Sequence, residues 1–426
     1  MDTIKKSQKI FLMIVGTVWF LVSINCFFIW GGLGRYFRII GTGGMLLFSF
    51  LIIKKWRFTT TNLLLIPCLL LFLFWLLQFT SGGLFLARIF DFLPLLLLFL
   101  WPKEILNDWY GFLRKVIIFF AIGASIVTIL SFIGVLQYIP YYTVDPTSQL
   151  HKDRGLQYHI YGLFLTIPSE TWASRACGPL QEPGHFAVLL GFFHLIDRFN
   201  HRKINFWIVL CGFLTFSSNF VLMFLFVEFH NFLMREKMVN AWKALFVGVV
   251  GFGLLSLVLP QDTKDQITYL FFERNLEKVY EDYEESGTLT GALDQRAGEY
   301  SLNRYNDLSR TGFIFGTGYY DSSSALSDYR GTILYIGLVG LLLSIFTSFF
   351  ILMTKGGWRV KVSLFLCLFL VYLHRSWMLY SAFLYFLSYM AIALNSLPST
   401  EISSIDEDTL PDEDTQSMDN MNVQLI

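Results

Sequence analysis

The chain has 426 residues, and its 32 basic and 32 acidic side chains cancel to a formal net charge of zero. Only 15% of the residues are charged, against roughly 25% in a typical soluble domain, whereas 54% are hydrophobic. A soluble fold of this length cannot bury so much apolar surface, so the composition excludes soluble enzymes, nucleic-acid-binding proteins and disordered scaffolds. The sequence therefore indicates a membrane protein.

Apolar stretches of about 20 residues, the length that crosses a bilayer, recur along the chain. The first covers residues 10–30 and follows Lys5, Lys6 and Lys9; no small-residue cleavage site comes after it, so we predict a retained span and not a signal peptide. The fold class predicted is an all-α polytopic membrane protein with about 12 transmembrane helices. The candidate spans are 10–30, 36–53, 62–78, 83–101, 116–137, 183–196, 204–217, 219–234, 244–260, 329–353, 361–374 and 377–395.

The positions of the basic residues predict the orientation. With the amino terminus inside, six cytoplasmic segments carry three basic residues each, and the short outer loops hold almost none beyond Arg35, Arg38 and Arg375. Because cytoplasmic segments of membrane proteins are enriched in Lys and Arg, both termini are predicted in the cytoplasm. The six groups begin at Lys5, Lys54, Lys103, Arg198, Arg235 and Lys355.

Two segments, 138–182 and 261–328, are too long for simple turns, and the span count places both on the outer face. The second has apolar residues at helical spacing, which predicts a small helical cap. The predicted organisation is 1–137 N-terminal transmembrane helices, 138–182 first large periplasmic loop, 183–260 central helices, 261–328 second large periplasmic loop, 329–395 C-terminal helices and 396–426 cytoplasmic tail. The tail is acidic and has no Lys or Arg, which predicts disorder.

The five cysteines predict neither a disulfide framework nor a metal site. Their number is odd, and all but Cys177 lie in apolar stretches.

A first group of chemically active residues lies at the end of the first large loop. Arg175, Glu182 and His185 stand around Gly178, Pro183 and Gly184, and a new span begins within a few residues. The proline and glycines predict a rigid turn that holds the charged side chains at the membrane surface. Two interpretations stay open: a functional site, or a loop-to-helix cap in which Glu182 lies at the helix N-terminus and pairs with Arg175.

A second group spans the end of the second large loop. Arg296 precedes a turn formed by Gly316 and Gly318, and Asp328 comes directly before the next span. A lone Gly-Thr-Gly is weak evidence of phosphate binding, and its predicted role is to return the cap to the membrane. Arg296 can alternatively pair with an acid on its own helix.

Arg88 and Asp91 lie three residues apart inside the fourth apolar span. Ionisable side chains at membrane depth are costly, so they are usually paired or functional. Helical spacing allows these two to pair with each other.

The first group resembles the superfamily of O-antigen polymerases (Wzy-type) and O-antigen ligases. That family has an outer-loop Arg, then Gly, then Glu-Pro-Gly leading into a span, and in its second loop an Arg, a Gly-x-Gly turn and a polar residue before a span with Gly-Leu-x-Gly. Ligases typically carry a His-Asn pair before that span, whereas this chain has Ser327-Asp328-Tyr329, which favours a polymerase. The matching residues are Arg175, Gly178, Glu182, Pro183, Gly184, Ala187, Arg296, Gly316, Gly318, Asp328 and Gly337 to Gly340.

The resemblance implies a membrane glycosyltransferase of the all-helical class C type, in the bacterial inner membrane. It would join oligosaccharide repeat units carried on undecaprenyl diphosphate, with no cofactor, nucleotide sugar or obligatory metal, and with a chain-length regulator and a flippase as expected partners. The leaving diphosphate needs arginine, because a planar fork binds phosphate bidentately. Arg175 and Arg296 are the first candidates, with Arg304 or Arg310 as substitutes; Glu182, Asp328 and His185 are candidates for the base that deprotonates the acceptor.

Two alternative functions stay open. A ligase would transfer finished polymer to a lipid A core. A lipid-linked oligosaccharide flippase would also have about a dozen spans, but it would carry charges around a central cavity and have short outer loops. Here the charged motifs lie in two large outer loops, which favours chemistry at the membrane surface.

Overall fold

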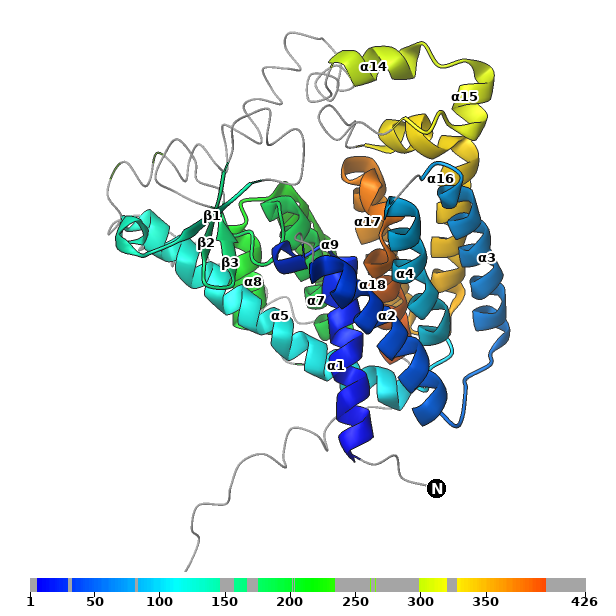
Figure 1. The fold of residues 1–426 in the computed structure, drawn as a ribbon, viewed down its shortest axis with the longest axis horizontal. Helices are drawn as coiled ribbons and strands as arrows, with labels where there is room; N and C mark the ends of the chain where they lie inside the picture. Colours follow the sequence, from blue (N-terminus) through cyan, green and yellow to red (C-terminus); the bar gives the residue numbers. More distant parts are fainter. Residues whose placement is uncertain are drawn as a thin grey trace, which may run out of the picture.

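The computed structural model of the chain describes residues 6–29, 33–80, 83–145, 157–166, 175–200, 202, 204–233, 261, 265, 299–319 and 328–395. These residues form a bundle of helices (Figure 1). Its first half contains α1 (Lys6–Ser23), α2 (Leu33–Ile52), α3 (Thr60–Leu77), α4 (Gly83–Leu98) and α5 (Lys103–Phe132), with the short 3-10 helices η1 (Phe27–Ile29) and η2 (Leu136–Tyr138).

The second half of the chain adds further helices to the same bundle. They are α7 (Pro183–Phe199), α8 (Phe206–Leu214), α9 (Ser218–Leu233), α14 (Glu299–Asn306), α15 (Arg310–Phe315), α16 (Tyr329–Met353), α17 (Trp358–His374), the 3-10 helix η4 (Ser376–Tyr380) and α18 (Ala382–Asn395). The short helices α14 and α15 lie at the end of the bundle opposite the start of α1, and this end is hereafter the cap end (Figure 1).

The described helices are those of a helical membrane protein. Four of them are long and apolar enough to cross a membrane: Gly34–Ile52, Thr60–Leu77, Lys103–Phe132 and Tyr329–Met353. Shorter apolar helices cover Ser7–Ser23, Ser218–His230 and Ala382–Asn395. The predicted span 244–260 and the acidic tail 396–426 lie outside the described residues.

Helix α5 differs from the prediction. The predicted span covers 116–137, and α5 begins earlier, running continuously over 30 residues from Lys103 through the charged stretch 103–115. At about 1.5 Å per residue it is about 45 Å long, which exceeds the ~30 Å hydrocarbon core of a bilayer. The helix continues through its charged first half because Arg114 finds a buried partner in Asp197 of α7.

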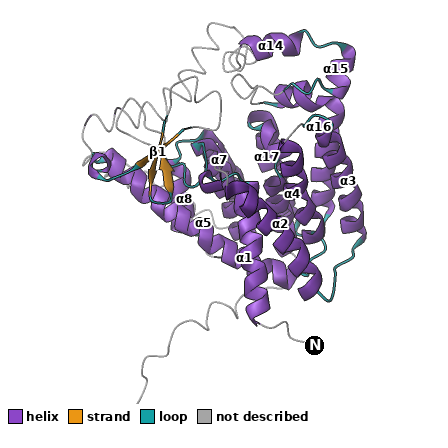
Figure 2. Cartoon of the chain, viewed as in Figure 1, coloured by secondary structure: helices purple, strands orange, loops and turns teal. Residues whose placement is uncertain are grey.

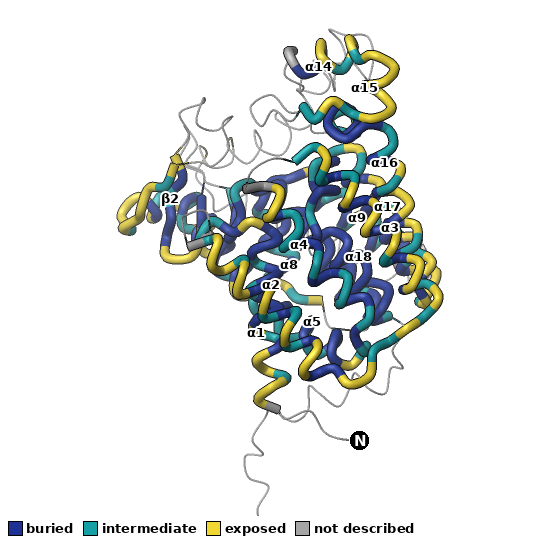
Figure 3. The backbone as a smooth tube through the Cα atoms, turned by 45° about the vertical axis from the view of Figure 1, so that its right-hand side comes forward, coloured by how far each residue is buried: buried dark blue, intermediate teal, exposed yellow. Residues whose placement is uncertain are grey.

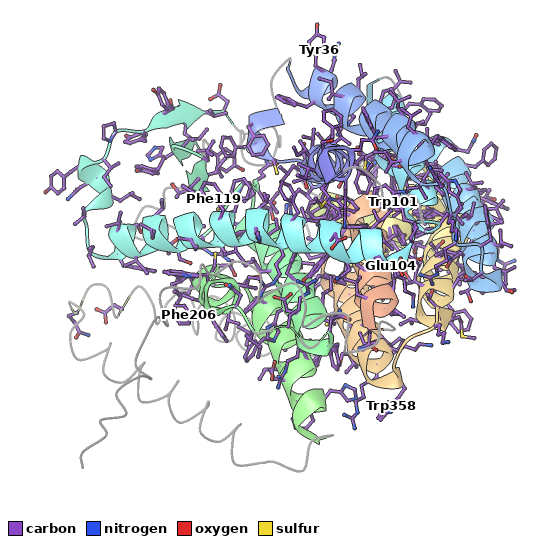
Figure 4. The ribbon with its side chains drawn as sticks, turned by 90° about the horizontal axis from the view of Figure 1, so that it is seen from below. Tyr36, Trp101, Glu104, Phe119, Phe206 and Trp358 are labelled. Atoms are coloured by element: carbon purple, nitrogen blue, oxygen red, sulfur yellow. The ribbon has the colours of Figure 1, made fainter. Side chains whose placement is uncertain are left out.

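The core is built around α7 and α18. Every side chain from Ala382 to Leu394 is buried, and a helix that is apolar on all sides belongs in the interior. Phe386 of α18 packs against Trp109, with ring centroids 4.8 Å apart. Figure 3 shows buried backbone at the centre and exposed backbone on the peripheral helices. In Figure 4, Trp101 lies among the helices, whereas Tyr36 points away from the bundle.

One small antiparallel sheet stands beside the helices, next to α5 and α8, and no strand is expected from the sequence there (Figure 2). Its strands are β1 (Tyr142–Val144), β2 (Tyr158–Tyr161) and β3 (Phe164–Thr166), in the order β1-β2-β3. Tyr142 faces Ile160, and Ile160 faces Leu165. β2 and β3 form a tight hairpin because Gly162 adopts a φ of +66°. In the described part of the first large loop, η2 is therefore followed by a small β-sheet.

Candidate functional site

The Glu182 carboxylate lies at the start of α7. Pro183 takes the first helical position, where its missing N–H costs no hydrogen bond. Glu182 is the N-cap residue, yet its side chain makes no cap hydrogen bond. Its Oε2 accepts a hydrogen bond from Nη1 of Arg375 at 3.0 Å and lies 3.1 Å from Nε2 of His185. The carboxylate therefore stands between two basic side chains.

Two glycines make room for this arrangement. A Cβ at Gly184 would overlap the guanidinium of Arg375, so the arginine lies directly against the glycine. Gly178 has a φ of +58°, and a Cβ there would overlap the ring of Phe186. The Glu-Pro-Gly sequence therefore starts α7 and also lets Arg375 reach Glu182.

Asp328 starts α16 and is held by Arg330. Its Oδ1 accepts a hydrogen bond from the backbone N–H of Arg330 at 2.9 Å, which is the usual geometry of an N-cap. Its Oδ2 accepts from Nε and Nη2 of the same residue at 3.0 and 2.7 Å. The side chains of Arg330 and Asp328 are only 12% and 14% exposed. Asp328 and Arg330 are therefore a largely buried ion pair at a helix start.

Residues 375–377 connect the start of α7, at Glu182, with the start of α16, at Asp328. Arg375 donates to Glu182, and the Ser376 hydroxyl donates to the backbone carbonyl of Asp328. The ring of Trp377 lies 4.1 Å from the ring of His185, centroid to centroid. Glu182 and His185 from the first motif and Asp328 from the second are thereby brought into one group. Glu182, His185, Asp328, Arg330 and residues 375–377 are hereafter the cap-end cluster.

Two tyrosines from the large loops border the cap-end cluster. Tyr158 of β2 forms a side-chain hydrogen bond with Gln181 and lies within electrostatic range of Glu182. Burial is the main cause that raises the pKa of the Tyr158 phenol. The pKa of Tyr305 in α14 is raised mainly by burial and, to a smaller extent, by the nearby Tyr329 phenol. Both phenols therefore remain protonated at neutral pH and can donate hydrogen bonds.

Arg175 contacts the turn between α8 and α9. Its Nε and Nη2 donate to the backbone carbonyls of Thr215 and Phe216, both at 3.0 Å. These carbonyls lie at the end of α8, where Phe216 adopts a φ of +47° and the chain turns into α9. A cation is favourable at the carbonyl end of a helix. In these contacts Arg175, seven residues before Glu182 in the chain, stabilises the α8–α9 turn.

The other predicted arginines belong to the second large loop. Arg304 of α14 lies over the ring of Tyr319, with its Cζ 4.1 Å from the ring centroid. Arg310 is exposed at the first position of α15. Arg296 lies outside the described residues. Arg304 also lines an open hollow of about 430 Å³ together with Asp307, Leu308, Ser309, Thr317 and Leu334.

Gly316 and Gly318 lie against an interruption in α16. Their φ angles are +85° and +69°, and Gly337 interrupts α16 with a φ of +73°. Gly316 and Gly337 approach so closely that a Cβ on either would overlap the backbone of the other segment. Only glycine fits such a contact without displacing the chain.

The interruption in α16 leaves backbone carbonyls that need donors from elsewhere. The N–H groups of residues 317 and 318 donate to the carbonyls of Leu334 and Tyr335, both at 3.0 Å. The indole of Trp75 donates to the carbonyl of Ile336 at 2.8 Å. Broken helices at membrane depth require such replacement hydrogen bonds. The Gly-Thr-Gly turn therefore attaches α15 to α16 by main-chain bonds.

Arg88 and Asp91 of α4 have partners on neighbouring elements. Oδ1 of Asp91 lies 3.2 Å from Nε of Arg38 on α2. Arg88 donates to the backbone carbonyl of Tyr380 in η4 and lies 5.9 Å from the centroid of its ring. The two residues thus link α4 to α2 and to η4, and Arg88 also acts electrostatically on Asp91, the partner that helical spacing allows.

A second polar group lies at the other end of α7. The carboxylate of Asp197 is 1% exposed and accepts hydrogen bonds from Nε of Arg114 at 2.7 Å and from the Tyr110 hydroxyl at 2.8 Å. Arg202 donates to Oδ1 of Asn107 at 2.6 Å and lies over the ring of Tyr110. Asp197 and Arg114, which the sequence prediction places outside the spans, therefore lie inside the bundle. The negative charge of Asp197 is compensated by Arg114 and by the Tyr110 hydroxyl.

Comparison of the chain with protein-family models, with curated proteins and with solved structures gives no match.

Sequence reasoning missed the residues that hold the cap-end cluster together. These residues are Arg375, Arg330, Ser376 and Trp377, of which the sequence indicates only Arg375, as an outer-loop cation. The available signal was the isolated Arg-Ser-Trp between two apolar stretches, 361–374 and 377–395. A cation kept at such a position indicates a specific partner.

The cap-end cluster combines two carboxylates, two guanidinium groups and an imidazole. A carboxylate can accept a proton from a hydroxyl group, and a guanidinium fork can bind phosphate oxygens. Among the described residues, no three His, Cys, Asp or Glu side chains are grouped as ligands for a metal ion.

Proposed function

We propose that the chain is a polysaccharide polymerase that joins lipid-linked oligosaccharide repeat units at the outer face of a bacterial inner membrane. The observation that carries the proposal is the cap-end cluster, in which Arg375 and Ser376 contact Glu182 and Asp328 respectively. These two acids come from the two motifs that resemble Wzy-type polymerases. Their convergence supports one site for both motifs.

The proposal includes about 12 spans, with both termini in the cytoplasm and the cap end facing the periplasm. Both α14 and α15, from the second large loop, lie at the cap end (Figure 1). Tyr158, from the first large loop, lies within electrostatic range of Glu182. This arrangement supports placing both large loops on the side where the substrates are carried.

The growing chain on undecaprenyl diphosphate is the proposed donor. The bond between its anomeric carbon and the diphosphate oxygen breaks, and the diphosphate leaves with the electron pair. Charge developing on the leaving group is stabilised best by preorganised donors. Arg375 and Arg330 are the proposed donors in the cap-end cluster, and Arg296 stays a candidate from the sequence. Arg175 is proposed to position the loop through its contacts with the α8–α9 turn.

A hydroxyl group of the incoming lipid-linked repeat unit is the proposed acceptor. Its oxygen forms the new bond to the anomeric carbon, and its proton passes to a carboxylate. Both oxygens of Asp328 already accept from Arg330, and its side chain is 14% exposed. The side chain of Glu182 is 27% exposed, so Glu182 is the more accessible acceptor and the proposed base.

The proposed partners are undecaprenyl-diphosphate-linked oligosaccharide and membrane lipid, with a chain-length regulator and a flippase acting beside the polymerase. No nucleotide sugar enters the proposed reaction, because the lipid diphosphate is the activating group.

Polysaccharide length in a strain that lacks the gene tests the proposal. The strain is complemented with wild type, Glu182→Gln, Arg375→Ala or Arg375→Lys, and the polymer is separated on a gel. We expect a ladder of long chains from wild type and single repeat units from Glu182→Gln and Arg375→Ala. Arg375→Lys keeps the charge but loses the planar fork, so we expect short chains.

Arg35→Ala is the matched control, because Arg35 is an exposed arginine of α2 outside the cap-end cluster. The amount of each variant in the membrane fraction shows whether it inserts. Long chains from inserted Glu182→Gln and Arg375→Ala would remove the cap-end cluster from the reaction. Long chains that accumulate on undecaprenyl diphosphate in the deletion strain, without transfer to the final acceptor, would identify a ligase.

A further inference from the structure

A second candidate site lies between α2 and α4, at positions where the helices expose apolar side chains. Arg38 stands between Phe37 and Ile39, which are 39% and 54% exposed, and Phe85, one turn before Arg88 on the same face of α4, is 39% exposed. In a membrane protein, exposed apolar side chains of this size face lipid. The two arginines therefore lie beside a surface that lipid covers.

Specific polar contacts fix α2 against α4 at this level. Pro94 of α4 has no N–H, so the carbonyl of Phe90 one turn earlier lacks its helical donor. The Thr42 hydroxyl of α2 donates to that carbonyl at 2.8 Å, and the indole of Trp19 donates to the carbonyl of Asp91 at 3.1 Å. The register that results holds Arg38 beside Asp91.

Among the described residues at this place, the positive and negative charges do not balance. Arg38 and Arg88 carry two positive charges, and Asp91, 3.2 Å from Arg38, carries one negative charge. Arg88 donates to the neutral backbone carbonyl of Tyr380, which does not neutralise it. Within the described part of the chain, the Nε–H of Arg88 is buried and has no hydrogen-bond acceptor. A cation with an unused buried donor at membrane depth requires an anion.

We infer that Arg38 and Arg88 bind the phosphate group of a membrane lipid between α2 and α4. Phosphate oxygens match the planar fork of arginine and supply the missing negative charge. The exposed apolar residues beside the arginines suit the hydrocarbon chain of the same lipid. This inference is independent of the proposed polymerase activity, because it depends only on charge, hydrogen bonding and lipid exposure.

The inferred site is connected to the cap-end cluster through η4. Tyr380, which accepts from Arg88, ends the 3-10 helix whose first residues, Ser376 and Trp377, contact Asp328 and His185. A lipid phosphate at Arg88 would therefore be linked to the cap-end cluster by one turn and a half of continuous backbone.

Binding of phosphatidylglycerol, a phospholipid that takes no part in the proposed polymerase reaction, to the full-length purified protein tests the inference. Retained lipid is counted by native mass spectrometry for wild type, Arg38→Gln, Arg88→Gln, Asp91→Asn and the control Arg35→Gln. Loss of one charge-assisted hydrogen bond is worth roughly a tenfold change in affinity. We expect Arg38→Gln and Arg88→Gln to bind about tenfold more weakly, and Arg35→Gln to bind like wild type.

Asp91→Asn keeps the inference testable if Arg88→Gln does not fold. It removes the only described negative charge beside the arginines, so we expect it to bind the lipid more tightly than wild type. Equal binding by wild type, Arg38→Gln and Arg88→Gln, or weaker binding by folded Asp91→Asn, would overturn the inference. Equal competition by inorganic phosphate would assign the arginines to a free anion and overturn the lipid assignment.

The two proposals fail separately. Single repeat units from Glu182→Gln with unchanged lipid retention would leave both standing. Normal retention by Arg88→Gln would remove the lipid site whatever the polymer length.

Discussion

Arg375 lies against Gly184, and its Nη1 donates a hydrogen bond to Oε2 of Glu182 at 3.0 Å. The two ends of this bond are 193 residues apart in the chain. The contact joins the first turn of α7 to the segment that follows α17. The orientation of the acid therefore depends on an arginine that no local motif contains.

Gly184→Ala is expected to disconnect these two side chains. The added Cβ would overlap the guanidinium of Arg375 and push it away from Glu182, at the cost of a charged hydrogen bond worth about 1.5–3 kcal/mol. We expect the variant to insert but to make mainly single repeat units. Gly43→Ala is the control, because nothing lies within 4 Å of a Cβ there. Long polymer from Gly184→Ala would show that the Arg375–Glu182 bond is dispensable.

The sequence predicted the helical membrane class because apolar stretches of spanning length are unambiguous in composition. It did not predict the length of α5, because a charged stretch such as 103–115 looks solvated until its buried partner Asp197 is known. The sheet at 142–166 was missed because its strands are three or four residues long. Periodicity cannot be detected over so few residues.

Only part of the candidate site could be predicted, because some of its residues are marked by local sequence and others are not. Glu182, His185 and Asp328 stand beside proline, glycine or a span start, so local sequence identifies them. Their common neighbours at 375–377 are contributed by tertiary packing, and one sequence contains no record of such contacts. The hydrogen bonds from Arg175 to the carbonyls of Thr215 and Phe216 were likewise not predictable, because they join the loop to a turn about 40 residues further along the chain.

Asp197→Asn is expected to destabilise the bundle strongly. The Asp197 carboxylate compensates Arg114 and accepts from Tyr110, and removing one member of a buried ion pair typically costs about 3–5 kcal/mol. Thermal unfolding in detergent would measure the loss. Tyr110→Phe is the comparison, because it removes one hydrogen bond worth about 1 kcal/mol and leaves both charges. Equal melting temperatures for the two variants would contradict a charge-dependent role.

Gly316→Ala is expected to detach α15 from α16. Gly316 has a φ of +85°, and a Cβ there would overlap the backbone at Tyr335 and Ile336. Gly134→Ala separates the two causes, because Gly134 has a φ of +72° but nothing lies within 4 Å of an added Cβ. We expect a loss of about 1 kcal/mol from the backbone conformation at Gly134 and a clearly larger loss at Gly316. Limited proteolysis between residues 310 and 328 would report the detachment, and equal cleavage of both variants would argue against it.

The sheet is expected to weaken as the pH falls. His159 of β2 stacks on Tyr141, with ring centroids 4.0 Å apart, and burial lowers the pKa of His159 below its ordinary value of 6.5. The unfolded chain therefore binds a proton at His159 at a higher pH than the folded chain does. Stability is unaffected well above pH 6.5 and decreases as the pH falls through that value, until the folded imidazole is also protonated.

His159→Phe isolates this effect, because phenylalanine keeps the stack on Tyr141 and does not titrate. Melting temperatures of wild type and His159→Phe are compared at about pH 7.5 and about pH 5.5, and the remaining histidines contribute equally to both proteins. We expect wild type to lose more stability than His159→Phe between these conditions. The NMR titration of His159 should give a midpoint below 6.5. A midpoint above that value would mean that an acidic neighbour, and not burial, determines the protonation of His159.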